Sequence, residues 1–462
     1  MTSNLKTAGI AAAFACAATN LRAADFSTNS IADPVASEPH ATMPFENTNQ
    51  VQQQNWNIHG QSTVVVQGYP GFSAQYSGPN SLPAGGQTRE TVTADLMAGV
   101  RLWHGAEAHA DGMMWQGSGV GNTFGVEAFP NGEANSEPTS VPNVNFVRAF
   151  IRQTIGLGGP TETVQDDALH LAGTRDISRL TITVGRFSGV DIFDNNSYAG
   201  NARTQFLNWG LGANEPWDFP QDSLGFMTGM VLELNRPQWT ARYGFFQMPA
   251  VAGGSALDQH FLKAWGMAIE LERRYAIEGH PGVIRLLGYL NHAHMGSYQE
   301  AIDNSPPGAA DIAATRAYRF KYGFGFNWEQ QIANNVGVFA RAGWSDGQSE
   351  AWCFTDVDHG ASLGASIAGA RWGRPHDTFG LGGVFNGITK VHQEFFADGG
   401  TGLLAGDGNL SYGWEKSLET YYDFQIWKRL HGAVDYQFVT NPAFNRARGP
   451  VSLFAGRLHW EF

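Results

Sequence analysis

The chain has 462 residues, among them 57 Gly, with 12% aromatic and only 15% charged residues. It is too long and too rich in Gly for a typical single soluble core, and its charged fraction lies well below the roughly 25% of soluble domains. No stretch approaches the ~18 consecutive apolar residues that a membrane-spanning helix requires, which excludes a helical membrane protein. The formal net charge of −13 argues against nucleic acid as a partner.

The first residues have the pattern of a secretory signal. Lys6 precedes an apolar, Ala-rich run over residues 7–18, and small residues follow near Ala23. We therefore expect a signal peptide over residues 1–23 that is cleaved after export, followed by a periplasmic or flexible segment over residues 24–55. The alternative is a frayed N-terminal tail.

A two-residue period recurs along the rest of the chain and predicts β-strands. In residues 318–329 every even position is aromatic, whereas the odd positions are Arg, Lys, Gly, Gly, Asn and Glu. Sixteen segments of this kind occur, most of them close to the ~9 to 11 residues that a tilted strand needs to cross a bilayer. They cover residues 56–67, 92–103, 106–115, 145–155, 179–187, 225–235, 238–247, 262–273, 282–292, 318–328, 335–345, 362–371, 376–386, 414–426, 431–439 and 451–462.

The predicted fold is all-β: a transmembrane antiparallel barrel of about sixteen strands over residues 56–462. Short and long connections alternate, as expected when both ends of a barrel lie in the periplasm. The charged connection over residues 156–178 is the exception, since a short link is expected there. The last strand ends on the aromatic Phe462, a terminal signal that the barrel-insertion machinery reads, and the mean hydropathy of −0.26 fits strands that face lipid and lumen in turn.

A barrel of sixteen strands leaves a lumen wide enough for water, so selectivity requires a segment that folds inward. The connection over residues 188–224 is the candidate, because it is rich in carboxylate, amide, guanidinium and aromatic groups. These groups can exchange hydrogen bonds with sugar hydroxyls and cover the apolar face of a sugar ring. The alternative is a solvated loop with no role in selection.

The strand pattern also places charged residues on the polar face of the wall. Arg148 and Arg152 are predicted to share that face with Phe146 and Phe150, opposite Val147 and its row. Opposite charges on neighbouring strands indicate a lumen field of mixed sign, the alternative being structural ion pairs that merely line the wall. The candidate pore and constriction residues are Asp95, Arg101, Glu107, Arg148, Arg152, Asp191, Asp194, Asn195, Arg203, Asn208, Trp209 and Asp218.

The sequence contains few motifs for metal binding, disulfide formation or catalysis. His292 and His294 could share a metal, but no carboxylate or Cys is suitably spaced nearby, so neither a metal nor a cofactor is expected. With Cys16 inside the signal segment, Cys353 is the only cysteine of the mature chain, and no disulfide can form within it. No P-loop, nucleophile elbow or dinucleotide fingerprint occurs, so an enzyme is not expected. An outer-membrane enzyme acting on lipid or lipopolysaccharide, and an adhesive barrel, are the alternatives from other classes.

Several stretches resemble the carbohydrate-selective porins of the OprB type, over nearly the whole mature chain. They include NWNIHGQ (55–61), YSGPNSL (76–82), AFPNGEA (128–134), RQTIGLG (152–158), FDNNSYA (193–199), RTQFLNW (203–209) and RAGWSDG (341–347). His104 and the stretch 200–202 depart from the family pattern, which leaves the sugar preference open.

The resemblance implies an outer-membrane pore with an inward-folded constriction and passive uptake of mono- and oligosaccharides. A general small-solute or ion porin is the alternative. The expected partners are the permeating sugars, outer-membrane lipid and lipopolysaccharide, and the barrel-insertion machinery, with the protein acting as a monomer or a homotrimer.

Overall fold

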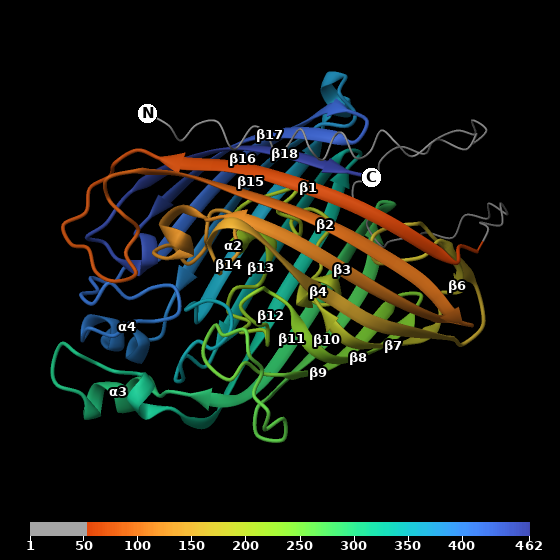
Figure 1. Ribbon diagram of the computed structural model, residues 1–462. Coiled ribbons are helices and arrows are strands. Elements are labelled where there is room, and N and C mark those ends of the chain that lie inside the picture. Colours follow the sequence, from red (N-terminus) through yellow and green to blue (C-terminus); the bar gives the residue numbers. More distant parts are fainter. Residues whose placement is uncertain (1–52) are drawn as a thin grey trace. The chain divides into compact units, whose positions relative to one another are not determined.

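The computed structural model describes residues 53–462, and the predicted signal peptide and nearly all of the segment 24–55 lie outside them. Sixteen antiparallel strands close into one barrel, in which β1 pairs with both β2 and β18 (Figure 1). Each predicted segment corresponds to one of these strands, so the predicted fold class is confirmed. The strands are β1 (Trp56–Tyr69), β2 (Gln87–Trp103), β3 (Ala106–Gly117), β4 (Thr139–Gly156), β7 (Arg179–Phe187), β8 (Met227–Arg236), β9 (Trp239–Gln247), β10 (Trp265–Ile277), β11 (His280–Met295), β12 (Ala317–Ala333), β13 (Val336–Ser345), β14 (His359–Ala368), β15 (Thr378–Gly387), β16 (Glu415–Trp427), β17 (Leu430–Thr440) and β18 (Val451–Glu461).

The two faces of each strand meet different surroundings, as the two-residue period predicts. On β12, Phe320 and Phe324 are more than half exposed on the outer surface, whereas Lys321 and Asn327 point inward and are buried. Because lipid covers the outside and loops fill part of the inside, apolar residues face outward and polar residues face inward. Among the described residues, no helix is long and apolar enough to cross a membrane.

Exposed tryptophans lie at the end of the barrel that carries the short turns, most of them in the sector from β16 to β2. Trp56, Trp103, Trp239, Trp427 and Trp460 all lie at strand ends on this side, with exposed fractions from 39% to 77%. Indole rings favour the membrane–water interface, and such girdles are typical of outer-membrane barrels. This end is the periplasmic side of the barrel.

A β-bulge in β4 corrects one prediction about the wall. The pairing with β3 shifts register between Asp111 and Gly112, which leaves Val147 as the extra residue. As a result Val147 is fully buried inside, while Phe146 is 73% exposed on the outside. A strict two-residue period places these two side chains on the wrong faces, because a bulge reverses the alternation.

The connections alternate between short and long, as predicted. The long loops carry α2 (Trp209–Gly212), α3 (Tyr298–Asn304) and α4 (Lys390–Ala397), together with short 3₁₀ turns. Figure 1 shows α3 and α4 at one end of the barrel and β6 at the other. The long periplasmic connection contains a small hairpin of β5 (Thr161–Val164) and β6 (Gly173–Asp176), which pair only with each other.

Candidate constriction site

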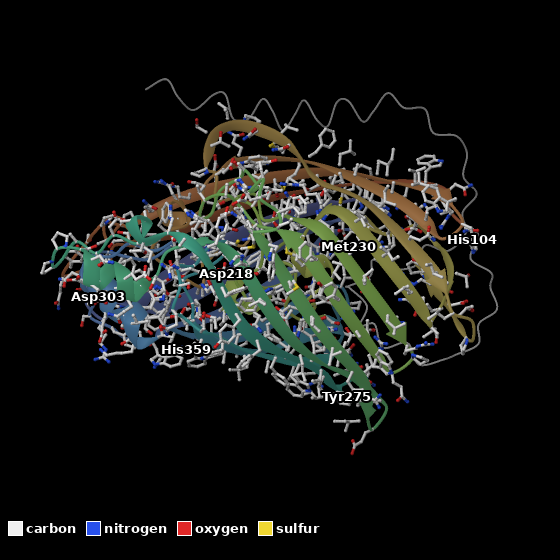
Figure 2. The ribbon with its side chains drawn as sticks, turned by 90° about the horizontal axis from the view of Figure 1, so that it is seen from below. His104, Asp218, Met230, Tyr275, Asp303 and His359 are labelled. Atoms are coloured by element: carbon white, nitrogen blue, oxygen red, sulfur yellow. The ribbon has the colours of Figure 1, made fainter. Side chains whose placement is uncertain are left out.

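The loop between β7 and β8, residues 188–226 and here called L3, folds into the barrel. Its side chains Phe193 and Trp217 pack against Phe246 of β9, and Phe206 and Leu211 pack against the opposite wall at β13–β16. Figure 2 shows Asp218 of L3 between the periplasmic end, marked by His104 and Tyr275, and the other end, marked by Asp303. The prediction that this loop folds inward is therefore confirmed.

Three of the candidate residues in L3 are buried and hold the loop in place. Asp194 accepts hydrogen bonds from the Asn214 backbone N–H (2.7 Å) and from the Asn327 side-chain amide (2.7 Å), and it forms an ion pair with Arg341 (3.2 Å). The side-chain amide of Asn208 donates to the Ala128 carbonyl at 2.8 Å.

Asp218 has the same kind of surroundings. Its carboxylate accepts from the backbone N–H groups of Trp352 (2.9 Å) and Cys353 (2.7 Å) and lies 3.3 Å from the Lys321 ammonium. Asp194, Asn208 and Asp218 are each at most 2% exposed, whereas Asn195 is exposed. Solvent in the pore therefore reaches Asn195 but hardly reaches the other three.

A group of opposite charges joins L3 to the wall formed by β2, β3 and β4. Arg203 of L3 forms ion pairs with Asp95 of β2 (2.6 Å) and with Glu133 (2.8 Å). Glu133 belongs to the loop between β3 and β4, residues 118–138, here called L2. The Arg203 side chain keeps 15% of its surface exposed, so it is paired and still reachable by solvent.

A second arginine on the same wall repeats this arrangement. Arg148 of β4 forms an ion pair with Asp111 of β3 (2.6 Å) and a two-pronged contact with Asp191 of L3 (2.8 and 3.0 Å). Arg148 is 16% and Asp191 14% exposed. Two carboxylates from different elements hold each guanidinium, so both arginines are fixed in direction with one side open to solvent.

Aromatic side chains border this charged group. Trp209 stacks on Phe129 of L2, with ring centres 5.7 Å apart, and contacts Phe354 edge-on. Trp209 also lines a small pocket with Phe206, Leu207 and Asn208. The site thus combines hydrogen-bonding groups with a flat apolar surface.

The remaining candidates, Arg101, Glu107 and Arg152, lie nearer the periplasm. Arg101 and Glu107 form an ion pair across β2 and β3 (3.2 Å), and Arg152 donates to the Leu169 carbonyl of the periplasmic connection (2.7 Å). Arg152 follows Arg148 by four residues on β4, which corresponds to ~13 Å along a strand. The twelve predicted residues are therefore spread over two levels of the pore and the buried base of L3.

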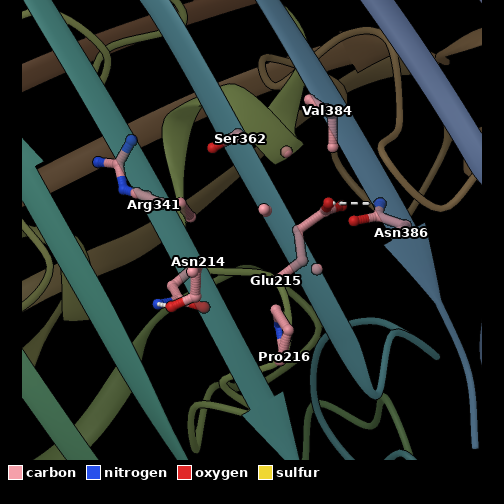
Figure 3. A pocket seen from close by; sticks show the side chains of 12 residues that line it. Asn214, Glu215, Pro216, Arg341, Ser362, Val384 and Asn386 are labelled. Atoms are coloured by element: carbon pink, nitrogen blue, oxygen red, sulfur yellow. Dashed lines mark hydrogen bonds between the residues drawn. The ribbon is translucent and has the colours of Figure 1, made fainter.

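A smaller pocket of about 190 Å³ lies between L3 and the wall at β13–β15 (Figure 3). Glu215 of L3 enters it and accepts a hydrogen bond from the side-chain amide of Asn386 (2.6 Å). The other carboxylate oxygen of Glu215 is buried without a hydrogen-bond partner in the described part of the chain. Burial, together with the nearby Glu415 carboxylate, raises the pKa of Glu215 to about 8.

The two histidines considered for a metal lie among outward-facing aromatic rings. His292 is 4.4 Å from the Phe320 ring and His294 is 5.2 Å from the Tyr318 ring. No group of three or more His, Cys, Asp or Glu within residues 53–462 is arranged to hold a metal ion.

Sequence reasoning missed the contribution of L2 and one further ion pair. Glu133 lies within the stretch 128–134 that resembles the OprB type, which was the available signal. Arg186 of β7 pairs with Asp222 of L3, and no local pattern distinguished these two residues from other charged positions.

A closed sixteen-stranded antiparallel barrel with an aromatic girdle and with loops folded into its lumen defines an outer-membrane porin. The family model of the carbohydrate-selective porins, OprB family, matches residues 80–462, and the chain belongs to this family. It is thus a carbohydrate-selective porin of the outer membrane, and both its family and its fold are those of channels.

Solved structures agree with the fold. The OprB channel of Pseudomonas putida at high pH superposes with a TM-score of 0.67 at 16% identity, over 88% of this chain and 94% of that one. OmpF of Salmonella typhi, in a complex with daunomycin, superposes with a TM-score of 0.50 at 10% identity, over 89% and 98% of the two chains. No curated protein matches this chain.

Proposed function

We propose that sugars diffuse passively through a constriction that L2 and L3 form against β2, β3 and β4. Its polar groups are Asp95, Arg148, Asp191 and Arg203 from the predicted set, together with Glu133. The observation that carries this proposal is the pairing of Arg148 and Arg203 with carboxylates from both wall and loop, which leaves 16% and 15% of the two side chains, respectively, open to solvent.

This arrangement suits neutral, polyhydroxylated solutes. A guanidinium donates to sugar oxygens, and a carboxylate accepts from sugar hydroxyls, so neighbouring hydroxyls find both partners along one wall. Because each arginine already has carboxylate partners, no isolated charge attracts an ion strongly. Trp209 and Phe129 supply the apolar surface that a sugar ring covers.

The other predicted residues take different parts in this proposal. Asp194, Asn208 and Asp218 position L3, because their polar groups are buried and bonded to the chain. Asn195 is open to solvent beside them, and Arg101, Glu107 and Arg152 line the wall toward the periplasm.

The test is the conductance of the protein in planar bilayers with glucose or maltose added. We expect sugar to block the wild-type channel and the block to weaken in Arg203→Ala. Arg371→Ala is the matched control, since Arg371 is an exposed cation in the periplasmic turn between β14 and β15. Equal sugar block in all three proteins would reject the assignment of the constriction. Channels that no sugar ever blocks would favour the general small-solute or ion porin.

The remaining expectations concern export and assembly. The proposal includes removal of residues 1–23 after export, which the N-terminal sequence of the purified protein tests. It also includes recognition of the last strand by the insertion machinery and contact of the outer surface with lipid and lipopolysaccharide. Light scattering of the detergent-solubilised protein distinguishes a monomer from a homotrimer.

A further inference from the structure

The connection between β4 and β7, residues 157–178, is much longer than the other periplasmic turns. Instead of extending away from the barrel, it contacts residues on the inner face of the wall. The side-chain amide of Asn57 on β1 donates to the Asp166 carboxylate and to the Asp167 carbonyl, both at 2.8 Å. Asn57 lies on the inward row of β1 and is only 4% exposed.

Two further contacts place this connection inside the mouth of the barrel. The His59 ring, also on the inward row of β1, lies 3.1 Å from the Asp166 carboxylate. Three strands further along the same wall, Arg152 of β4 donates to the Leu169 carbonyl, and the Leu169 side chain packs against the apolar cluster that contains Phe150 and Phe187. The connection is thus tied to β1 and to β4 at once.

The base of the connection is itself ordered by ion pairs and backbone bonds. Glu162 of β5 forms ion pairs with Arg175 of β6 (2.8 Å) and Arg179 of β7 (2.9 Å). The Ala172 carbonyl accepts from the Gln54 N–H, and the Ala172 N–H donates back to the Gln54 side chain. A segment held at so many points is a fixed part of the pore wall.

The exposed part of this connection carries negative charge. The side chains of Asp166 and Asp167 are 41% and 56% exposed, although their backbone lies against the inner wall. Burial opposes ionisation of Asp167, but His170, the Leu169 backbone N–H and Arg152 together outweigh it and lower the pKa of Asp167 to about 2. This carboxylate is therefore charged at every physiological pH.

We propose that residues 157–178 form a second constriction at the periplasmic exit, which limits solute size and disfavours anionic solutes. It lies below the first one on the same wall, at the level of Arg152. A sugar that leaves the charged group of L2 and L3 next meets the carboxylates of Asp166 and Asp167, which accept hydrogen bonds from neutral sugar hydroxyls and repel carboxylated sugars. The proposal rests on the channel function proposed above, but not on which residues form the first constriction.

Two variants test the size limit and the charge separately. In the first, an Asn-Gly turn replaces residues 159–176, because two-residue turns of this kind connect antiparallel strands directly. In the second, Asp166→Asn and Asp167→Asn are combined, which retains the oxygen that Asn57 binds. Glu278→Gln is the matched control, since Glu278 is an exposed carboxylate in the periplasmic turn between β10 and β11. Retention of the folded, fast-migrating band in unheated electrophoresis confirms that each barrel is intact.

The readouts are single-channel conductance and liposome swelling with glucose, a trisaccharide and glucuronate. We expect the shortened turn to raise conductance and to speed trisaccharide entry relative to glucose, while glucose still blocks the channel. We expect the double Asn variant to raise the permeability of glucuronate relative to glucose, by up to about tenfold at low ionic strength, and to shift the reversal potential toward anions. If the shortened turn matches wild type in conductance and in size preference, the second constriction is refuted.

The charge assignment has its own refutation. Glucuronate permeability and reversal potential in the double Asn variant that equal those of Glu278→Gln would overturn it. These outcomes are separate from a failure of the first constriction, which appears instead as unchanged sugar block in Arg203→Ala with the periplasmic turn intact.

Discussion

The buried carboxyl of Glu215 makes the packing of L3 dependent on pH, and Glu215→Gln should remove this dependence. Glu215 is 3% exposed, and within residues 53–462 only one oxygen of its carboxyl group is hydrogen-bonded: it accepts from the side-chain amide of Asn386. Burial, together with the carboxylates of Asp356 and Glu415, also raises the pKa of the neighbouring Glu127 well above its usual value. An amide at position 215 keeps the contact with Asn386 and never acquires charge.

The size of the effect follows from the two pKa values. A change from the ordinary 4.5 to about 8 corresponds to about 5 kcal/mol of free energy that favours the neutral carboxyl in the folded state. Because the folded-state pKa is the higher one, this stabilisation is fully present below pH 4.5 and is lost as the pH rises through 8. Between pH 6 and 9 the wild-type protein should lose about 3 kcal/mol, whereas Glu215→Gln should lose almost none of it.

The assay is denaturant unfolding of the refolded protein in detergent at pH 6 and pH 9, followed by the change in electrophoretic mobility of the folded band. Current noise in bilayers at the two pH values reports on L3 in the same samples. Glu278→Gln, which removes an exposed carboxyl, should follow wild type. A wild-type stability that is equal at both pH values, or a loss of stability that persists in Glu215→Gln, would refute this reasoning.

Three other substitutions probe the charged group, the base of L3 and the outer surface. Arg148→Ala leaves Asp111 and Asp191 without their guanidinium, so the reversal potential in a salt gradient should shift toward cations; a shift toward anions would contradict the assignment. Asp218→Ala leaves the Lys321 ammonium and several backbone N–H groups buried without a partner, and it should destabilise the protein by about 3 to 5 kcal/mol in equilibrium unfolding, whereas Asp303→Ala on the exposed side of α3 should cost far less. Phe324→Lys places a charge near the middle of the lipid-facing surface and should cost about 2 to 4 kcal/mol of folding free energy in lipid vesicles, while a cost near zero would mean that this surface does not face hydrocarbon.

The strands could be predicted from the sequence because a membrane barrel requires apolar side chains on its outer face and polar ones on its inner face, in alternation along every strand. Residues such as Phe320 and Lys321 alternate so strictly that they reveal the faces without any knowledge of neighbours. Val147 shows the limit of this reasoning, since the bulge depends on pairing with β3 and leaves no mark in the period itself.

The site was less predictable because a loop has no period. Asp191 and Asp194 are three residues apart and carry the same carboxylate group. Asp191 binds Arg148 at the edge of the pore, whereas Asp194 is buried and paired with Arg341. Which carboxylate is buried depends on contacts with distant strands, such as that with Arg341. The inward path of residues 157–178 was hidden for the same reason, since its partners Asn57 and Arg152 lie far away in the sequence.

Two of the buried ties of L3 and the charged groups that meet the solute attach to different parts of the wall, whereas Asn208 ties L3 to L2. Asp194 and Asp218 attach to β12 and β13 and to the loop that follows β13, whereas Arg203 and Asp191 meet β2 and β4. L3 therefore spans the lumen, with Asp194 and Asp218 attached to one part of the wall and its solute-contacting charges on another. Substitutions among the solute-contacting charges need not weaken the buried contacts of Asp194 and Asp218. The preference for one sugar over another can therefore diverge during evolution, or be altered by design, while the barrel and the packing of L3 stay the same.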